Sequence, residues 1–267
     1  MDDIKLSDVA KKVYISPFYL QKTFSILCGY SLSEYIRNRK LSLAGKDLMN
    51  TDEKIIDIAI KYGYESSDSF TKAFKRFHNA NPSSIRKGGK TIKEFSPLKV
   101  NLILKGGYTM EYKIELKEAF EVIGLSKIMK YEEASKEVPK LWKSFFEKEQ
   151  LSSICTKYGI NIDSTMSGNG FEYIICDDYS DNKEVPKDFV IRKIPKHTWA
   201  IFSCIGKADT SVSQMNEKIF KEWLPSSTDY EIADGYNIEM YSDPVNFEKG
   251  TEDDKYYCEI WIPIRKK

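Results

Sequence analysis

Few residues in this chain have the types and spacing that covalent chemistry requires. His78 and His197 stand in no catalytic motif, and the sequence has no nucleophile elbow and no Ser/His/Asp arrangement. The cysteines lie far apart, with no C-x-x-C pair and no histidine at metal-ligand spacing: Cys28, Cys155, Cys176, Cys204 and Cys258. We therefore expect reduced thiols, no metal, no cofactor and no enzyme, which leaves non-covalent binding as the chemistry to look for.

The distribution of charge indicates two different binding partners. The formal net charge is +1. Lys and Arg outnumber Asp and Glu in residues 1–90, whereas acidic residues are in excess in residues 111–267. A basic segment suits a polyanion, and an acidic segment suits a neutral or cationic partner.

One acidic residue near the C-terminus has neighbours that favour a cation as its partner. In "CEIWIPI", strand alternation places Glu259 and Trp261 on one face of a strand, opposite Cys258, Ile260 and Ile262. An ionised carboxylate among apolar groups is costly unless a positive charge meets it, and aromatic rings attract cations. A solvent-facing strand residue is the alternative interpretation of Glu259.

The composition is that of a folded protein with room for two domains. The chain has 267 residues, of which 41% are hydrophobic and 30% charged, more than one typical small domain needs. No apolar run approaches the roughly 20 residues of a membrane span, and the acidic N-terminus is unlike a signal peptide. We expect a cytoplasmic protein.

The elements that would position a polyanion-binding surface occur twice in the basic segment. "DVAKKVYISPFYLQKTF" (residues 8–24) is echoed by "DIAIKYGYESSDSFTKAF" (residues 57–74), and both copies have helical apolar spacing around a turn. Ser16-Pro17 and Ser66 or Ser67 are N-cap signals for the second helix of each copy. Between them, residues 31–52 predict one long helix that begins with a Ser31–Glu34 capping box. We therefore predict that this segment forms two helix-turn-helix units joined by a helix. A plain helical bundle is the alternative.

The stretch "DEKIIDIAIKYGYESSDSFTKAFKRFHNANPSSIRKG" resembles the signature of the AraC/XylS-type DNA-binding domain, through its turn "GYES" and its ending "PSSIR". The resemblance covers about residues 4–88 and implies that the second helix of each unit enters the major groove of double-stranded DNA. It places Phe18, Gln21, Lys22 and Ser25 on the first reading helix and Ser67, Asp68, Thr71, Lys72 and Lys75 on the second, with Arg37, Arg39, Lys75, Arg76 and Arg86 at phosphates. For each lysine, a solvated surface charge is the alternative.

This segment departs from the family pattern at two points. The family usually has another helix before the first unit, and here only "MDDIKL" precedes it, so we expect either a truncated chain or a first unit that is incomplete and docks weakly. Lysine also stands where arginine is frequent in the reading helices, which makes bidentate guanine recognition less secure. A protein that no longer binds operators and only sequesters a ligand is therefore one alternative function.

Residues 91–109, with two Gly-Gly pairs and prolines nearby, predict a linker between a DNA-binding domain at 1–90 and a second domain at 110–267. From residue 110 onward, strands with one helix per half predict a duplicated β-β-α-β unit. The expected fold class is thus an all-α double helix-turn-helix followed by an α+β domain, with one antiparallel sheet and a central ligand cleft.

This second half resembles the GyrI-like effector-binding domain through "KIPKHTWAIFSCIG", "FKEWLPSS", "IEMYSDP" and "CEIWIPI". The resemblance implies a carboxylate, walled by aromatic rings, that binds lipophilic cations. The residues expected at the ligand are Glu259, Trp223, Tyr241, Trp261, Glu172, Tyr173, Trp142 and Phe146, with Glu239 as a second carboxylate candidate. Ordinary core packing is the alternative for each aromatic residue.

Together the two resemblances predict a one-component transcriptional regulator that binds operator DNA and a small, cationic effector, with RNA polymerase as a further partner. The alternative from another class is a small-molecule hydrolase that uses Glu259 as base and Tyr241 as hydrogen-bond donor.

Overall fold

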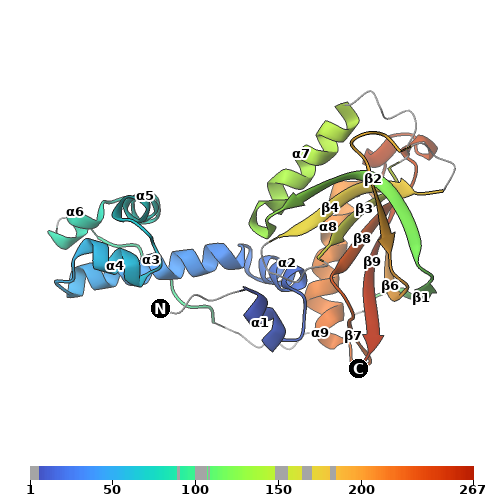
Figure 1. The fold of residues 1–267 in the computed structure, drawn as a ribbon. Coiled ribbons are helices and arrows are strands. Elements are labelled where there is room, and N and C mark those ends of the chain that lie inside the picture. Colours follow the sequence, from blue (N-terminus) through green and yellow to red (C-terminus); the bar gives the residue numbers. More distant parts are fainter. Residues whose placement is uncertain are drawn as a thin grey trace. The chain divides into compact units, whose positions relative to one another are not determined.

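The structure, a computed structural model, describes residues 6–88, 91–99, 107, 109–147, 156–163, 170–180 and 185–267. These residues form two compact units (Figure 1). One unit holds Tyr30–Gly107, and the other holds Lys5–Gly29 together with Tyr108–Lys267. This division differs from the boundaries predicted at residues 90 and 110, because the first helix pair groups with the C-terminal half.

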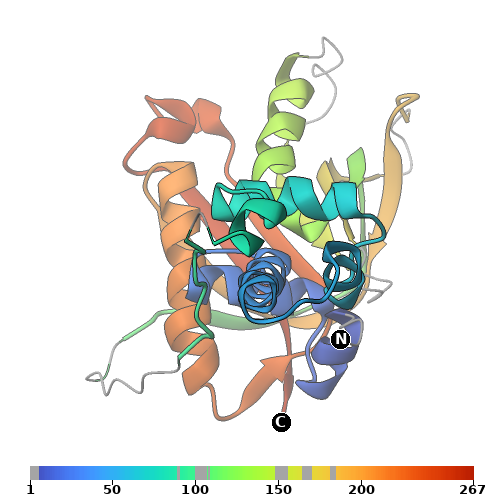
Figure 2. The same ribbon diagram turned by 90° about the vertical axis from the view of Figure 1, so that its left-hand side faces the viewer.

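The first unit is a cluster of helices around α3. Figure 2 views α3 nearly end on, with α4, α5 and α6 gathered around it. The helices are α3 (Leu32–Asn50), α4 (Ile55–Lys61), α5 (Ser67–His78) and α6 (Pro82–Arg86). Leu41 and Leu48 of α3, Ile58 of α4, and Phe70 and Phe74 of α5 form one buried core. Helical spacing of apolar residues along each helix produces this core.

The helix ends of this unit follow the predicted signals. The Ser31 hydroxyl accepts a hydrogen bond from the Glu34 amide at 3.1 Å, so the first half of the predicted capping box is present. Ser66 caps α5 in the same way through the Ser69 amide at 3.2 Å. The helix α5 is followed by the C-cap residue Asn79, whose φ of 59° lies in the left-handed region.

The first part of the predicted linker packs along this unit. The Lys93 amide donates to Nδ1 of His78 at 3.0 Å, and the Phe95 amide donates to the Ser42 hydroxyl at 2.9 Å. His78 is buried, and its Nε2 lies 2.9 Å from the Leu41 carbonyl oxygen. This histidine therefore has a packing role, and burial lowers its pKa.

The second unit is built on one antiparallel sheet that contains nine strands in the described residues. Its order is β1-β6-β9-β8-β3-β4-β2-β5, with β7 beside β9. The strands are β1 (Lys113–Lys117), β2 (Phe120–Met129), β3 (Tyr158–Ile162), β4 (Phe171–Asp178), β5 (Val190–Ile194), β6 (His197–Ile205), β7 (Tyr230–Ile232), β8 (Tyr236–Tyr241) and β9 (Tyr257–Lys266). The predicted antiparallel sheet is confirmed.

The strand order relates the two halves of this unit. Strands β1, β2, β3 and β4 of the first half correspond in turn to β5, β6, β8 and β9 of the second. When each strand is exchanged with its counterpart, the sheet order is the same read from the opposite edge. Each half thus contains the pattern β-β-α-β-β, to which the second half adds β7, and the predicted β-β-α-β unit was one strand short in the first half. The missed strand is β3, "YGINI", whose Gly159 and Asn161 are poor strand formers.

Helices cover one face of this sheet, which we call the helix face. They are α7 (Ala134–Glu147) and α8 (Ala208–Lys218), the latter continued by the π-helical turn η3 (Ile219–Trp223) and by α9 (Leu224–Ser226); short 3₁₀ turns occur at η1 (Tyr131–Glu133), η4 (Pro244–Asn246) and η5 (Gly250–Glu252). Leu141 and Phe145 of α7 are buried, but Phe146, expected at the ligand, is 59% exposed. It lies next to Phe145 along the helix and therefore on another side of it.

The two faces of the sheet have separate cores. Tyr173 and Ile260 belong to the cluster on the helix face, which also contains helix side chains. Trp199, Ile238 and Trp261 belong to the cluster on the opposite face, whose buried members are all strand residues. Neighbouring strand residues alternate between these clusters because successive side chains point to opposite faces.

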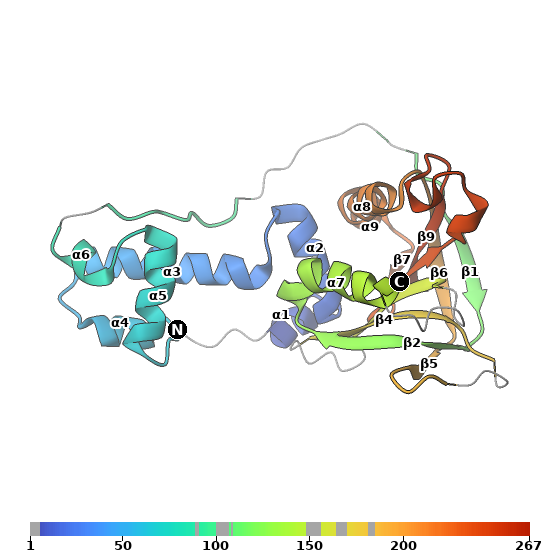
Figure 3. The ribbon, with the colours of Figure 1, turned by 90° about the horizontal axis from the view of Figure 1, so that it is seen from above.

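The first helix pair, α1 (Leu6–Lys12) and α2 (Pro17–Cys28), is part of this second unit. Helix α2 lies on the helix face between α7 and α8 (Figure 3). Ser16 caps α2 by accepting from the Tyr19 amide at 3.2 Å, as predicted. Of the described cysteines, Cys28, Cys176, Cys204 and Cys258 are free thiols, and Cys155 lies outside the described residues. No helix in the described ranges is long and apolar enough to cross a membrane.

Candidate DNA-reading and effector-binding sites

Helix α5 has the exposed polar face expected of a reading helix. Its apolar side, with Phe70 and Phe74, is fully buried. The residues predicted to read or hold DNA lie on the other side: Ser67, Asp68, Lys72, Lys75 and Arg76 are exposed, and Thr71 is half-buried. The strongly amphipathic spacing of "SDSFTKAFKRFH" produces this separation.

Three arginines predicted at phosphates have different surroundings. Arg37 is exposed on α3. Arg39 donates from Nη1 to the Phe95 carbonyl oxygen. Arg86 is half-buried, and within the described structure its Nε and Nη2 have no hydrogen-bond partner. Arg37 is the member of this set that is open to a phosphate without rearrangement.

The predicted reading face of α2 is covered. Phe18 is 6% exposed, Gln21 is 7% exposed, and Lys22 and Ser25 are half-buried. Phe18 and Lys22 contact the second unit's own sheet and helices, so in this structure they are not presented to DNA. The reason is that α2 carries aromatic residues which pack against the helix face.

Helix α2 is held there by polar and aromatic contacts. The Phe18 amide donates to Oδ2 of Asp163 at 2.8 Å, which places a carboxylate at the N-terminus of the helix, where it is favourable. The Tyr19 hydroxyl donates to the Tyr236 carbonyl oxygen at 2.5 Å. The Phe18 and Phe171 rings are 5.4 Å apart, and Tyr19 lies 6.0 Å from Phe220.

Lys22 brings a positive charge onto the helix face. Its Nζ donates to Oδ1 of Asn237 at 2.8 Å and lies 5.7 and 5.6 Å from the ring centroids of Phe18 and Phe220. The side chain as a whole is half-buried, but its ammonium lies among these groups. Burial lowers the pKa of Lys22 to about 8, and the carboxylate of Glu239 opposes that shift.

Glu239 is a carboxylate on the helix face. On β8 it pairs with Ile260, a member of the helix-face core, and it is half-buried. The Tyr241 hydroxyl donates to Oε2 of Glu239 at 2.9 Å. Trp142 lies 5.5 Å from the Tyr241 ring, and its Nε1 donates to the Tyr173 hydroxyl at 2.9 Å. We call these four residues, Glu239, Tyr241, Trp142 and Tyr173, the Glu239 cluster.

Gly159 makes the room that this cluster needs. On β3 it pairs with both Ile175 and Glu239, so it lies on the same face as the cluster. A Cβ at this position would meet the Tyr173 hydroxyl at 2.3 Å, closer than real atoms approach. The strand therefore has no side chain at the point where the Tyr173 hydroxyl meets Trp142.

Glu259 lies on the opposite face and already has a lysine as its ion-pair partner. It is 5% exposed and accepts hydrogen bonds from Nε1 of Trp261 at 2.6 Å and from the Tyr257 hydroxyl at 2.7 Å. Nζ of Lys113 is 3.4 Å away, and Nζ of Lys117 lies 4.6 Å from the Trp261 ring centroid. Its cation is thus supplied by β1, which lies beyond β6 in the sheet.

The predicted ligand residues therefore do not form one site. Tyr241, Tyr173, Trp142 and Glu239 share the helix face, whereas Glu259, Trp261 and Glu172 lie on the opposite face. Glu172 is held by Arg192 through three hydrogen bonds of 2.8 to 3.1 Å. The pair proposed for a hydrolase, Glu259 with Tyr241, is split by the sheet, and the tyrosine hydroxyl is bonded to Glu239 instead.

The sequence did not predict a role for Asp163, Asn237 and Phe220, which contact α2. Asn237 could have been found, because strand alternation places it on the same face as Glu239 and Tyr241. Asp163 follows β3, the strand that was not predicted, and no sequence pattern marks it as a contact of α2. In the described part of the chain no three His, Cys, Asp or Glu side chains are placed to hold a metal ion.

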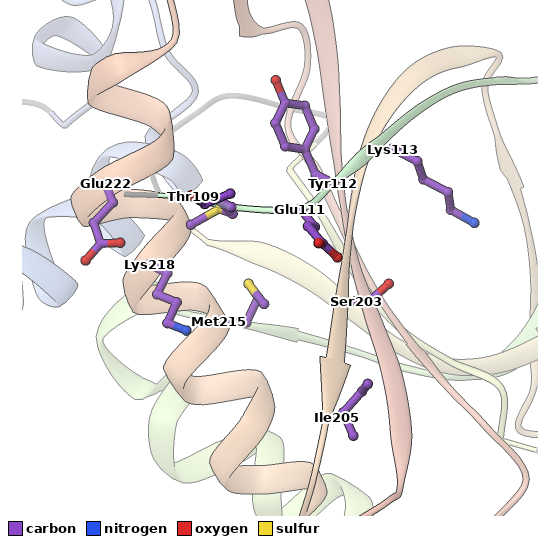
Figure 4. Close-up of a pocket in the computed structure, with 10 residues that line it drawn as sticks. Thr109, Glu111, Tyr112, Lys113, Ser203, Ile205, Met215, Lys218 and Glu222 are labelled. Atoms are coloured by element: carbon purple, nitrogen blue, oxygen red, sulfur yellow. The ribbon is translucent and has the colours of Figure 1, made fainter. Parts of the chain in front are cut away.

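A separate hollow of about 570 Å³ lies between α8 with η3 and the segment that leads into β1 (Figure 4). Met215, Lys218 and Glu222 line one side, and Tyr112 and Lys113 line the other. The Tyr112 ring covers Trp223, with centroids 5.3 Å apart, and Trp223 also packs on Phe202 at 4.9 Å. Trp223 is therefore a core residue behind the wall of this hollow.

Comparisons with known proteins match the two parts of the chain to two sequence families. Residues 9–88 match a helix-turn-helix domain family, and residues 113–264, more than half of the chain, match the Cass2 family of integron-associated effector binding proteins. The PqrA protein of Proteus vulgaris is 39% identical over 88 residues, which cover 33% of this chain and 72% of PqrA. The SoxS regulatory protein of Salmonella typhimurium is 40% identical over 83 residues, which cover 31% of this chain and 78% of SoxS.

A solved structure has the fold of the second half. The protein SAV2435, solved with bound tetraphenylphosphonium, is 16% identical and has a TM-score of 0.51 over 58% of this chain and 94% of its own. This likeness concerns the fold alone. With both sequence families matched in order along the chain, the protein belongs to the AraC-type helix-turn-helix transcriptional regulators and carries a Cass2/GyrI-like effector-binding domain.

Proposed function

We propose that this regulator couples operator binding through α5 and α2 to the binding of a small lipophilic cation at the Glu239 cluster. The observation that carries the proposal is a half-buried carboxylate on the helix face with two tyrosines and a tryptophan beside it. A carboxylate in such surroundings favours a positively charged partner, and each ring adds cation–π attraction of about 0.5–2 kcal/mol.

Glu239 suits this role better than Glu259. Glu259 already has a lysine and two hydrogen-bond donors, so an added cation would have to displace Lys113. Glu239 accepts a hydrogen bond from Tyr241, and the ammonium of Lys22 on α2 is a positive group that acts on it. The cation bound by SAV2435 is of the same chemical class as the proposed effector.

On the DNA side, Lys72 is the side chain we propose for base contact, and Lys75, Arg76 and Arg37 are proposed at phosphates. All four are exposed in the first unit. Phosphate contacts supply affinity, and contacts to base edges supply sequence preference. Effector binding would then change operator affinity or the recruitment of RNA polymerase through differential affinity for two states.

Titration with tetraphenylphosphonium, followed by tryptophan fluorescence, tests the effector site. Saturable quenching is expected, because Trp142 belongs to the cluster. Glu239→Gln should weaken binding tenfold or more, about 1.4 kcal/mol, whereas Glu259→Gln should change it less than threefold. Glu248→Gln, at an exposed position, is the matched control. Equal affinity in wild type and Glu239→Gln would remove Glu239 as the anchor.

A further inference from the structure

The surface that α2 covers adjoins the proposed effector site. Asn237 and Glu239 are alternate residues of β8 and lie on the same face of the sheet. Asn237 binds Lys22 of α2, and Glu239 acts on the same ammonium. Any occupant that pairs with Glu239 therefore meets the end of the Lys22 side chain.

We propose that helix α2 is a built-in ligand of the effector-binding sheet, in which Lys22 takes the place of the cationic effector, and that the effector displaces α2 and frees it for DNA. This inference rests on the proposed function, because it assigns the regulation of the same site.

The contact surface has the character of a specific interface. Phe18 and Tyr19 are 6% and 0% exposed, and both belong to the buried core of the second unit. Two polar groups of α2 are satisfied across this contact: the Phe18 amide by Asp163, and the Tyr19 hydroxyl by the Tyr236 carbonyl. Buried aromatic anchors together with matched hydrogen bonds are typical of the centre of a binding interface.

Lys22 has the surroundings that a bound organic cation would have. Its ammonium is bonded to Asn237 and lies within 6 Å of two aromatic ring centroids. This is the geometry in which rings attract cations. The chain thus supplies a positive charge at the place where the proposed effector would bring its own.

One face of α2 cannot pack on the sheet and contact DNA at the same time. Of the residues that the family resemblance assigns to DNA, Phe18 and Lys22 contact residues of the sheet, and Gln21 is buried. While α2 is docked, only α5 has its reading face exposed. Since two units reading neighbouring major grooves need both helices, docking would weaken operator binding.

A lipophilic cation can compete because a primary ammonium is a poor fit to this place. Burial lowers the pKa of Lys22 to about 8, so keeping the ammonium charged there is unfavourable. A larger cation with dispersed charge loses less hydration energy on burial. A tethered helix acts at an effective concentration of roughly millimolar. Docking should therefore weaken the apparent affinity for the effector, and loosening α2 should strengthen it.

Amide hydrogen exchange of the full chain, with and without tetraphenylphosphonium, tests the displacement. Saturating cation should speed exchange in peptides that cover Pro17–Cys28 at least tenfold, while peptides from α5 stay unchanged. The neutral compound triphenylphosphine oxide is the matched ligand control and should have no such effect.

Variants that loosen α2 give a second readout. Asp163→Ala removes the acceptor of the Phe18 amide, and Lys22→Glu places a carboxylate near Glu239; each should tighten tetraphenylphosphonium binding about tenfold. Asp254→Ala, at an exposed position, should leave the affinity unchanged. If Asp163→Ala fails to fold, Lys22→Glu still provides the test, because it changes a side chain that is half-buried.

The outcomes separate this inference from the proposed function. Binding that depends on Glu239 with unchanged α2 exchange would overturn the displacement and leave the proposed function standing. No binding in the wild type or in either loosened variant would overturn both. Faster α2 exchange together with tighter binding in the loosened variants would support both.

Discussion

The two reading helices of this chain begin and end alike, yet one is exposed and the other is covered. Each has 12 residues and a serine N-cap, and each ends at a residue in the left-handed region, Gly29 or Asn79. In the repeat, Lys22 corresponds to Lys72. The difference lies two residues beyond each cap, where α2 has Phe18-Tyr19 and α5 has Asp68-Ser69.

That difference explains the two environments. Phe18 and Tyr19 give α2 a second apolar surface, on the side that α5 leaves polar. Burying a large side chain stabilises by about 1.5–3 kcal/mol, so two aromatic residues are enough to favour docking on the helix face. A DNA-reading motif can therefore also be the segment that an effector-binding domain recognises.

The largest expected effect separates the two lysines of the repeat. Lys72→Ala should weaken operator binding by about 2 kcal/mol, roughly 30-fold, whether or not tetraphenylphosphonium is present, because Lys72 is exposed on α5. Lys22→Ala should cause a comparable loss only in the presence of the cation. Fluorescence anisotropy with operator DNA measures both.

Lys143→Ala is the control for these lysines, since its side chain is 79% exposed on α7 and is not part of either proposed site. If Lys22→Ala weakened DNA binding equally with and without cation, α2 would not be sequestered in the free protein. The contrast between α2 and α5 would then disappear.

An exchange of residue types between the two helices should have a smaller effect. Tyr19→Ser gives α2 the residue that α5 has, and it removes both the bond to the Tyr236 carbonyl and the contact with Phe220. We expect operator affinity without effector to rise about tenfold, within the range of coupling energies between two sites. Anisotropy titration with the same operator measures this change.

The reverse exchange, Ser69→Tyr, is the control, because Ser69 is exposed and a surface substitution changes stability by about 0.5 kcal/mol or less. It would remove the Ser69 side-chain bonds at the helix start but should not bury α5. Unchanged or reduced operator affinity in Tyr19→Ser would contradict the role of this tyrosine in docking.

The sequence predicted well what local chemistry decides. Ser16, Ser31 and Ser66 cap the helices at which they were expected, and alternation correctly put Glu259 and Trp261 on one face of β9. What it could not decide was which face of the sheet carries the helices. That depends on contacts between residues far apart in the chain.

The docking of α2 depends on such contacts entirely. Asp163, Tyr236 and Asn237 follow α2 by more than a hundred residues, and no local pattern relates them to Phe18 or Lys22. Periodicity indicated that α2 has an exposed face, but it does not say which surface covers that face. The choice between Glu259 and Glu239 could not be made from the sequence for the same reason: both carboxylates lie on strands with aromatic neighbours, and only the fold separates them.

The smallest expected effect is a dependence of α2 docking on pH. The pKa of Lys22 is lowered from 10.5 to about 8 when α2 is docked, so the undocked state binds more protons between these values. Raising the pH from 8 towards 10.5 should therefore favour docking, and below pH 8 the dependence should vanish. Because one proton is linked, the change stays below tenfold per pH unit. The apparent affinity for tetraphenylphosphonium should fall accordingly.

Other groups that face α2 should contribute little in this range. Burial raises the pKa of Tyr19, Tyr173 and Tyr241 well above the usual value, so these phenols stay protonated. Lys22→Met, which has no titrating group, should make the affinity for the cation nearly independent of pH from 8 to 10. If the affinity of Lys22→Met for the cation still changed with pH, the linked proton would belong to another group. The difference between α2 and α5 would then rest on their aromatic residues alone.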